Sequence, residues 1–350
     1  MKKKIIDLFS GVGGLSLGFE MANFEVSLAI DCWKDAIETF NYNRKFKVGT
    51  TKNIFEFTDE EIKNLKEEVV GVIGGPPCQG FSMVGKRDHE DKRNSLYLEF
   101  VRFVKNIEPN FFVLENVKGL LTLRSGYFKK DIIKRFSGIG YNISFKVLRA
   151  SDYGVPQNRD RVFFVGLNKK YYKNTYFEFP QKNNIIVSSG DALSDLPSLD
   201  NNEIGEDYKT PAINDFQKFS RENCNKVFNH EKTKHLEQTI DIIKRVPDGG
   251  NIKSISDKFY KIRNYNSAFR RMDSKKPSNT IDCGHRNYFH YCENRIPTVR
   301  ESARLQSFPD NFIFKGAKTS QYTQVGNAVP PLLAYALAKK IKKTIKINKK

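Results

Sequence analysis

The chain has 350 residues, and its 59 Lys and Arg against 40 Asp and Glu give a formal charge of +19. Hydrophobic residues make up 39% and aromatic residues 13%, which is too much apolar side chain for a disordered polycation. This composition predicts a folded protein attracted to polyanions, with nucleic acid as the leading partner and an anionic membrane surface as the weaker one.

The sequence also excludes several classes of protein. No apolar run approaches the length of about 18 residues that would predict a transmembrane helix. The N-terminal segment is basic but meets Asp7 too early to contain the apolar core of a secretory signal. The 5 cysteines are scattered and odd in number, which argues against a disulfide framework. We therefore expect a reduced, cytoplasmic protein without a membrane anchor.

Strand-like and helix-like segments alternate through the first part of the chain. Short apolar runs predict strands at residues 4–9, 26–30, 69–73, 111–114 and 162–167. Helical spacing of apolar residues predicts helices at 33–42, 60–69 and 96–107. This alternation predicts a Rossmann-like, doubly wound α/β domain that binds its ligands at the carboxyl ends of the strands.

The pattern changes near residue 179, where Asn, Ser, Gly and Pro divide the chain into short segments without a clear period. Regular structure returns near the end of the chain, with a predicted helix at 330–347 that has lysines on one face. We predict one domain from residues 1–178 and 305–350, and a smaller, irregular domain from 179–304.

A glycine turn follows the first predicted strand. Gly11, Gly13 and Gly14 would allow the backbone to pass close to a ligand that faces the following helix N-terminus. The pattern is neither the dinucleotide fingerprint nor a P-loop. Asp31 ends the second predicted strand, where an acid suits the hydroxyls of a ribose. Asp31 also fits as the N-cap of the next helix, and the two roles are compatible.

Cys78 lies in a rigid loop, since it directly follows Pro76 and Pro77 and the loop is flanked by glycines. Such a loop at the end of a buried strand presents a cysteine to a ligand crevice, where a thiolate is a nucleophile. For the other cysteines, we expect the inert behaviour of small apolar residues.

Six motifs, taken in order, resemble those of the DNA cytosine-5 methyltransferases of bacteria and phages. They are DLFSGVGG at 7–14, GPPCQ at 75–79, ENV at 115–117, QNRDR at 157–161, RESARLQSFP at 300–309 and QVGNAVP at 324–330. Any one of these motifs could arise by chance, whereas the whole series in this order rarely does. The resemblance covers nearly the whole chain.

The resemblance implies methyl transfer to C5 of cytosine in double-stranded DNA. Cys78 would add to C6, and Glu115 would act at N3 of the ring. Arg161 would contact the base with support from Arg159, since side chains two apart on a strand share one face. The structural alternatives are a carboxylate of Glu115 that simply pairs with an arginine, and a salt-bridged strand edge at Asp160.

The resemblance also implies S-adenosylmethionine as cofactor, S-adenosylhomocysteine as product, and no metal. It places Phe9 against the adenine or sulfonium, the glycine turn near the methionine part and Asp31 on the ribose. The predicted cofactor-binding residues are Phe9, Gly11, Val12, Gly13, Gly14, Asp31, Cys32, Asn53, Ile54, Pro77, Leu96, Asn327 and Val329. Two positions depart from the family pattern, because Asn53 replaces a frequent Asp and Cys32 replaces a frequent aromatic residue.

Because C6 is inaccessible in a stacked duplex, the resemblance implies that the cytosine is flipped out of the helix. Residues 80–95 would form a basic loop that closes over the DNA, and residues 179–304 would read the target sequence. The aromatic and basic residues at 259–265, with Arg270 and Arg271, are further candidates for DNA contact. We expect a monomer, with a cognate restriction endonuclease acting on the same site.

Three alternatives remain at this point. A tRNA cytosine methyltransferase of the same fold would share every motif, and an enzyme acting on an exocyclic amine would not need Cys78. A DNA-binding module without catalytic activity would be expected to lack Cys78, Glu115 or Arg161, and all three are present. A zinc site built from Cys283, His285, His290 and Cys292 is disfavoured, because the spacing within each pair is too short.

Overall fold

The structure is a computed structural model that describes residues 2–66, 69–77, 96–255, 269–284 and 288–347. It divides into two compact units. The first contains Met1–Arg149, Asp160–Lys182 and Leu333–Lys350, and the second contains Ala150–Arg159 and Asn183–Leu332. The sequence prediction assigned all of 305–350 to the first domain, whereas 305–332 lies in the second unit. The target-recognition role of 179–304 stays a prediction.

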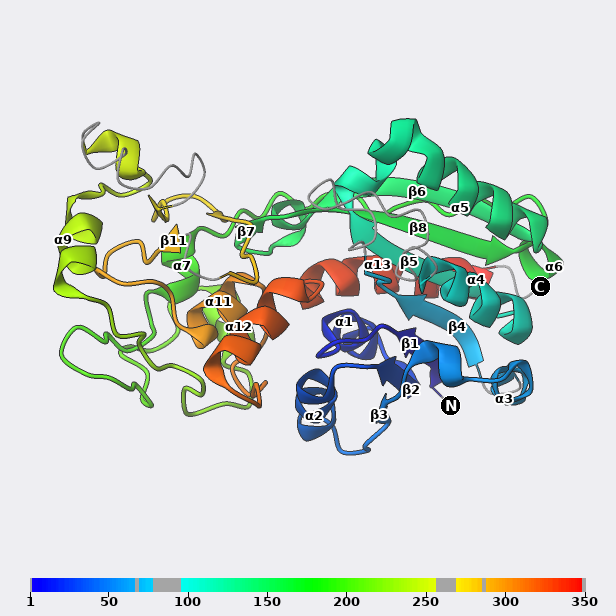
Figure 1. The fold of residues 1–350 in the computed structure, drawn as a ribbon, viewed down its shortest axis with the longest axis horizontal. Coiled ribbons are helices and arrows are strands. Elements are labelled where there is room, and N and C mark those ends of the chain that lie inside the picture. The colour runs from blue at the N-terminus through cyan, green and yellow to red at the C-terminus, as the bar shows by residue number, and fades with distance from the viewer. Residues whose placement is uncertain (1, 67–68, 78–95, 256–268, 285–287, 348–350) are drawn as a thin grey trace. The chain divides into compact units, whose positions relative to one another are not determined.

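The first unit is built on a seven-stranded sheet with the order β3-β2-β1-β4-β5-β8-β6 (Figure 1). All strands run parallel except β8, which pairs antiparallel with both of its neighbours. The strands are β1 Lys3–Leu8, β2 Phe24–Asp31, β3 Gly49–Thr51, β4 Val69–Gly74, β5 Phe111–Val117, β6 Tyr141–Arg149 and β8 Asp160–Asn168. This topology confirms the predicted doubly wound α/β class.

Helices cover both faces of this sheet. The helices of the first unit are α1 Gly14–Met21, α2 Lys34–Tyr42, α3 Asp59–Asn64, α4 Leu96–Ile107, α5 Tyr127–Gly138, α6 Lys169–Tyr172 and, from its third residue on, α13 Pro331–Ile347. On one face, Phe100 of α4 and Phe136 of α5 pack against Phe112 of β5. On the other face, Phe19 of α1 stacks on Phe111, since neighbouring residues of a strand point to opposite faces.

The predicted strands and the helix at 96–107 are found nearly where the apolar pattern places them. The helix predicted at 60–69 is wrong at its C-terminal end, because α3 ends at Asn64 and Val69 begins β4. Val69 lies on the buried strand next to β1, so its burial in the sheet outweighs the helical spacing of the preceding residues.

The second unit consists of short elements, as its turn-rich sequence predicts. Its helices are α7 Ser189–Leu193, α8 Asp215–Ser220, α9 Glu237–Arg245, α11 Val299–Leu305 and α12 Lys318–Asn327. Two pairs of two-residue strands accompany them: β7 Gln157–Asn158 with β10 Ser278–Asn279, and β9 Arg270–Arg271 with β11 Tyr288–Phe289.

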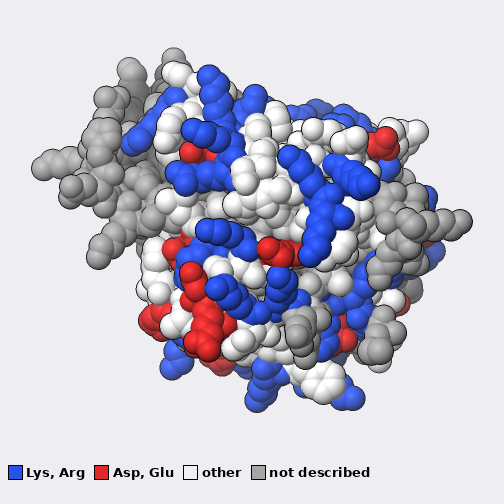
Figure 2. Space-filling model, turned by 90° about the vertical axis from the view of Figure 1, so that its right-hand side faces the viewer, with Lys and Arg blue, Asp and Glu red and all other residues white. Residues whose placement is uncertain are grey.

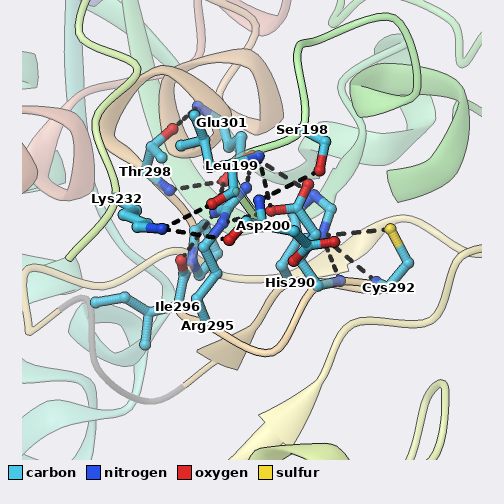
Figure 3. Close-up of polar contacts among 12 residues, drawn as sticks. Ser198, Leu199, Asp200, Lys232, His290, Cys292, Arg295, Ile296, Thr298 and Glu301 are labelled. Atoms are coloured by element: carbon cyan, nitrogen blue, oxygen red, sulfur yellow. Dashed lines mark hydrogen bonds and ion pairs between the residues drawn. The ribbon is translucent and has the colours of Figure 1, made fainter. Parts of the chain in front are cut away.

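Buried ion pairs hold these short elements together. Glu301 of α11 accepts two hydrogen bonds from Arg295, each of 2.7 Å, and Arg295 also pairs with Glu293 (Figure 3). The Nδ1 atom of His290 accepts the backbone N–H of Glu293, so its Nε2 faces Glu301 at 3.5 Å. These groups lie in the RESARLQSFP motif or just before it, so the motif has a structural role within this unit.

Within the described ranges, no helix is both long and apolar enough to cross a membrane.

Candidate active site

The glycine turn at the carboxyl end of β1 has an unusual backbone. Phe9, Gly11 and Gly13 have φ values of 59°, 52° and 82°, all in the left-handed region that favours glycine. A Cβ on Gly13 would lie 2.5 Å from the ring of Phe40 and 2.8 Å from a guanidinium nitrogen of Arg44. The close packing explains why Gly13 is glycine, and the left-handed Phe9 is a strained position of the kind found at binding sites.

Asp31 joins this turn to the end of β2. One carboxylate oxygen accepts the backbone N–H of Gly11 at 2.8 Å, and the other accepts the N–H of Trp33 at 2.9 Å. Burial raises the pKa of the Asp31 carboxyl, while the hydrogen bonds from Trp33 and Gly11 lower it. The predicted N-cap role is wrong, because α2 begins at Lys34 with Trp33 as its N-cap and no side chain caps it. Asp31 instead holds the backbone before the helix and fixes the position of the glycine turn.

Two buried oxygen atoms, one on β1 and one in the turn, have no hydrogen-bond partner among the described residues. They are Oδ1 of Asp7 and Oγ of Ser10. The other carboxylate oxygen of Asp7 accepts the hydroxyl of Ser16. Burial raises the pKa of Asp7 to about 7. Because buried polar atoms are nearly always satisfied, these two oxygens suit a bound molecule or water with hydrogen-bond donors.

The other predicted cofactor residues have varied surroundings. Asn53 caps the short 3-10 helix Ile54–Glu56 by accepting the N–H of Phe55, and Ile54 is buried. Cys32 is exposed, and Pro77 is exposed at the end of the described part of its loop. Leu96 is half-buried at the first residue of α4.

Asn327 and Val329 belong to the second unit. Asn327 ends α12, where its Oδ1 accepts the thiol of Cys283 at 2.9 Å, and Val329 is buried. Their role in cofactor binding stays a prediction.

Glu115 and Arg161 form an ion pair at the same edge of the sheet as the glycine turn. The Nε of Arg161 lies 3.0 Å from Oε1 of Glu115, and both side chains are largely buried. The edge is shared because Leu8, Gly74 and Leu114, near the ends of β1, β4 and β5, are in register. The two predicted catalytic side chains, Glu115 and Arg161, thus lie together. An ion pair of Glu115 with an arginine is also what we expected if Glu115 had only a structural role.

Gly75 lies directly against the carboxylate of Glu115. A Cβ at this position would lie 2.8 Å from Oε2 of Glu115, so only glycine leaves room for the carboxylate where it stands. Gly75 therefore places the loop of Pro76 and Pro77 next to Glu115. Cys78 itself lies outside the described residues, as does the predicted basic loop at 80–95.

Asn116 links the two segments. Its side-chain amide donates to the carbonyl of Pro76 at 3.0 Å, and its Oδ1 accepts the N–H of Val117 at 2.8 Å. Asn116 is buried, so it holds the backbone two residues before Cys78 against the end of β5.

We expected Arg159 and Arg161 to share one face of a strand, but they do not. It lies between β7 and β8, and its guanidinium donates to the carbonyls of Ile281 at 3.1 Å and Gly326 at 2.7 Å. The strand argument fails because the regular strand begins only at Asp160. Arg159 is buried in the second unit, and its supporting role in catalysis stays a prediction.

Arg271, which we considered for DNA contact, is also buried. Its guanidinium donates to four backbone carbonyls, those of Ile243, Val246, His290 and Glu293. Arg271 therefore holds the loops of the second unit together. The aromatic and basic residues at 259–265 lie outside the described residues. Among the described residues, no group of three His, Cys, Asp or Glu side chains is arranged to hold a metal ion.

Sequence reasoning missed the structural contributions of Asp7, Gly75 and Arg44. The first two lie inside motifs, but their roles depend on contacts with Ser16 and Glu115. Arg44 lies outside every motif; it stacks over Phe40, pairs with Glu20 and donates to the carbonyl of Gly13 at 3.3 Å. Arg44 reaches Gly13 and Glu20 across more than 20 residues, which no local pattern in the sequence indicates.

Comparison with known proteins identifies the family. The family model for C-5 cytosine-specific DNA methylases matches residues 3–343. The chain is 41% identical to the Type II methyltransferase M.DdeI of Desulfomicrobium norvegicum, over 96% of this chain and 88% of that protein. It is 38% identical to the Type II methyltransferase M1.HphI of Haemophilus parahaemolyticus, over 98% of this chain and 87% of that protein.

A solved structure has the same fold throughout. It is a proposed DNA modification methyltransferase encoded within an E. coli prophage, with a TM-score of 0.83 and 30% identity over 99% of this chain and 100% of that one. The S. pombe Dnmt2 methyltransferase, at 16% identity and a TM-score of 0.63 over 98% of this chain and 99% of that one, shows a similar fold. The chain thus belongs to the C-5 cytosine-specific DNA methylase family.

Proposed function

We propose that this enzyme transfers a methyl group from S-adenosylmethionine to C5 of a flipped-out cytosine in a specific double-stranded DNA sequence. The observation that carries the proposal is the ion pair of Glu115 with Arg161. The carboxylate of Glu115 lies directly against Gly75, the residue before Pro76 and Pro77. The proposed substrate position follows from this pair, because a cytosine ring that meets Glu115 at N3 also comes within reach of the Cys78 loop.

Each residue at this edge has a distinct proposed role. Cys78, as a thiolate, adds to C6 and so makes C5 nucleophilic. Glu115 holds the proton at N3 that offsets the charge formed on the ring. Arg161 orients the carboxylate of Glu115 through its Nε and contacts the base. Asn116 holds the backbone at Pro76, two residues before Cys78, next to Glu115.

Methylation is completed when the C5 proton leaves and the bond between Cys78 and C6 breaks. The reaction requires a base extruded from the duplex, because C6 is shielded on both faces by stacking.

The residues around the glycine turn fit S-adenosylmethionine. The partnerless oxygens of Asp7 and Ser10 suit an ammonium group, and the carboxylate of Asp31 suits ribose hydroxyls. Gly11 and Gly13, with left-handed backbone conformations, have no side chains that would keep a ligand away from the turn. When bound, the cofactor would supply an electrophilic methyl group on its sulfonium. Asp31 would hold the ribose, and Phe9 would pack against the adenine or the sulfonium.

We further propose that the enzyme belongs to a restriction-modification system and that the second unit contributes to target recognition. The relatives at 41% and 38% identity are named Type II methyltransferases, which supports this assignment. The same two relatives favour DNA over tRNA as the substrate, because the Dnmt2 likeness at 16% identity indicates the fold alone.

Transfer of labelled methyl from S-adenosylmethionine to mixed-sequence duplex DNA and to tRNA, wild type beside Cys78→Ala, tests the proposal. We expect label in DNA at C5 of cytosine for the wild type and none for the variant. Label in tRNA alone would favour the RNA enzyme. Absence of label in both substrates would leave a binding module and overturn the proposal.

A further inference from the structure

Three charged side chains meet at the first residue of β8, one position along the chain from Arg161. Asp160 accepts Nε of Arg149 at 2.9 Å and Nη2 of the same side chain at 3.3 Å. The Nζ of Lys118 lies 3.5 Å from Oδ2 of Asp160. Strand register produces this cluster, because Arg149 lies opposite Asp160 in the β6–β8 pair and Lys118 directly follows the last residue of β5.

The cluster lies at the catalytic edge of the sheet. The carbonyl of Asp160 accepts Nη1 of Arg161 at 2.8 Å, and the same guanidinium pairs with Glu115. Lys118 follows the carboxyl end of β5, where open α/β sheets bind their ligands. Asp160 thus touches Arg161 through its backbone and both surface cations through its side chain.

Charge and exposure at the cluster suit an anion. Lys118 and Arg149 have side-chain exposures of 63% and 54%, and the two cations share a single carboxylate. The Glu115–Arg161 pair is balanced, so these five side chains together carry one more positive than negative charge. Water screens exposed ion pairs and leaves them weakly held, which allows both cations to turn towards another anion.

We propose that Lys118 and Arg149 bind backbone phosphates of the DNA strand that carries the target cytosine, and that Asp160 pairs with the two cations only while no DNA is bound. The inference rests on the proposed function, which places the cytosine ring at Glu115 and Arg161. The phosphates that flank this nucleotide then come near the neighbouring row of side chains. The guanidinium of Arg, which can donate two hydrogen bonds at once, and the ammonium of Lys are the two common protein ligands of phosphate.

Lys66 provides a matched control. It forms an exposed ion pair with Glu108 at 2.6 Å, with side-chain exposures of 48% and 50%. Lys66 precedes β4 and Glu108 precedes β5, so this pair lies at the amino ends of the strands, away from the catalytic edge. Lys66→Ala therefore removes one paired surface cation without touching the proposed site.

The test is fluorescence anisotropy of a labelled mixed-sequence duplex, titrated with the full chain at several salt concentrations. Each phosphate contact contributes about 0.9 to the slope of log K against log salt. We expect Lys118→Ala and Arg149→Ala each to lower this slope by about 1. The double variant should lower it by about 2 and weaken binding roughly 10-fold to 100-fold at low salt. Lys66→Ala should change neither quantity.

Two further variants separate phosphate binding from a structural role. Lys118→Arg combined with Arg149→Lys keeps both charges, so we expect most of the salt slope to return. Asp160→Asn removes the competing carboxylate, so binding should be equal or tighter. If Asp160→Asn instead weakens binding as much as the double alanine variant, or if Lys66→Ala gives the same loss as Lys118→Ala, the proposal is overturned.

Failure of this proposal can be distinguished from failure of the proposed function, because the binding assay involves no methyl transfer. An enzyme that methylates DNA normally, with an unchanged salt slope in the double variant, would contradict only the phosphate site. A protein that binds duplex DNA through Lys118 and Arg149 but transfers no methyl would contradict only the proposed reaction.

Discussion

The carboxyl of Asp7 is buried, and the groups around it shift its pKa in opposite directions. Burial raises its pKa to about 7, while the hydroxyl of Ser16 and the charge of Arg44 lower it. Asp31 and Glu20 raise it further. In the folded chain Asp7 keeps its proton well above the pH at which an unfolded Asp loses it, so its ionisation opposes folding at higher pH.

The sign of this effect gives a prediction. The contribution of Asp7 to stability is complete below pH 4 and is lost as the pH rises through about 7. Asp7→Asn cannot ionise, so its free energy of unfolding relative to the wild type should be higher at pH 8 than at pH 5. Urea unfolding without cofactor at both pH values measures this difference. Asp215→Asn, which changes a fully exposed side chain, is the control. If the free energy of unfolding of Asp7→Asn differs from that of the wild type by the same amount at pH 5 and pH 8, the prediction is refuted.

Gly75 gives a second prediction at the scale of one residue. The added methyl group in Gly75→Ala would lie 2.8 Å from Oε2 of Glu115 and must displace the carboxylate. A displacement of about 1 Å at a catalytic group costs roughly 100-fold in rate. We expect kcat to fall by about that factor, with little change in the KM for S-adenosylmethionine. Gly119→Ala, where an added Cβ has open space, is the matched control. Unchanged kcat in Gly75→Ala would show that Glu115 tolerates the displacement.

At the scale of elements, the two units are stabilised differently. The first unit buries aromatic side chains between its sheet and its helices, whereas the second joins short helices through buried ion pairs. Helix α11 provides Glu301 to Arg295 and Arg304 to Asp195 and Asp310. In Figure 3, Lys232 and Leu199 extend the same network, with Lys232 donating to the carbonyl of Leu199 at 3.0 Å.

Removal of one partner from this network should be costly. Glu301→Gln leaves the guanidinium of Arg295 buried with only Glu293 to balance it. Breaking a buried pair in this way costs about 3–5 kcal/mol. We expect a clear fall in the urea midpoint, measured beside Glu203→Gln, which breaks the exposed pair with Lys234. Equal effects of the two variants would argue against a stabilising role for α11.

The elements also show what sequence can and cannot predict. Apolar runs predicted β1, β4, β5 and β8, because strands buried on both faces need continuous apolar residues. Motif order predicted that Glu115 and Arg161 belong to one site. The link from Asn116 to Pro76 spans 40 residues, and the carbonyls that hold Arg159 come from Ile281 and Gly326. Such contacts depend on how distant segments pack, which local patterns do not encode.

At the scale of the whole molecule, the formal charge of +19 is the property most relevant to DNA. Basic side chains are spread over the face shown in Figure 2, and the acidic ones gather mainly in one part of it. A charge of this kind attracts any polyanion, so specificity must come from particular contacts rather than from the total.

This gives a prediction for the full chain. Affinity for duplex DNA of any sequence should fall steeply with salt, because bound phosphates release counterions. Sequence preference should change much less, since base contacts involve fewer charges. Titration of labelled mixed-sequence DNA at two salt concentrations measures the affinity, and competition between duplexes of different sequence at the same salt concentrations measures the preference. A salt-independent affinity would show that the charge has no part in binding DNA.

The most direct test of the central claim is a covalent trap. In a mixed-sequence duplex with 5-fluorocytosine at every cytosine, fluorine replaces the proton that must leave C5, so the bond from Cys78 to C6 cannot break after methyl transfer. With S-adenosylmethionine, the wild type should form a DNA complex that survives a denaturing gel, and Cys78→Ala should form none. A wild type that methylates ordinary DNA but forms no such complex would contradict the account.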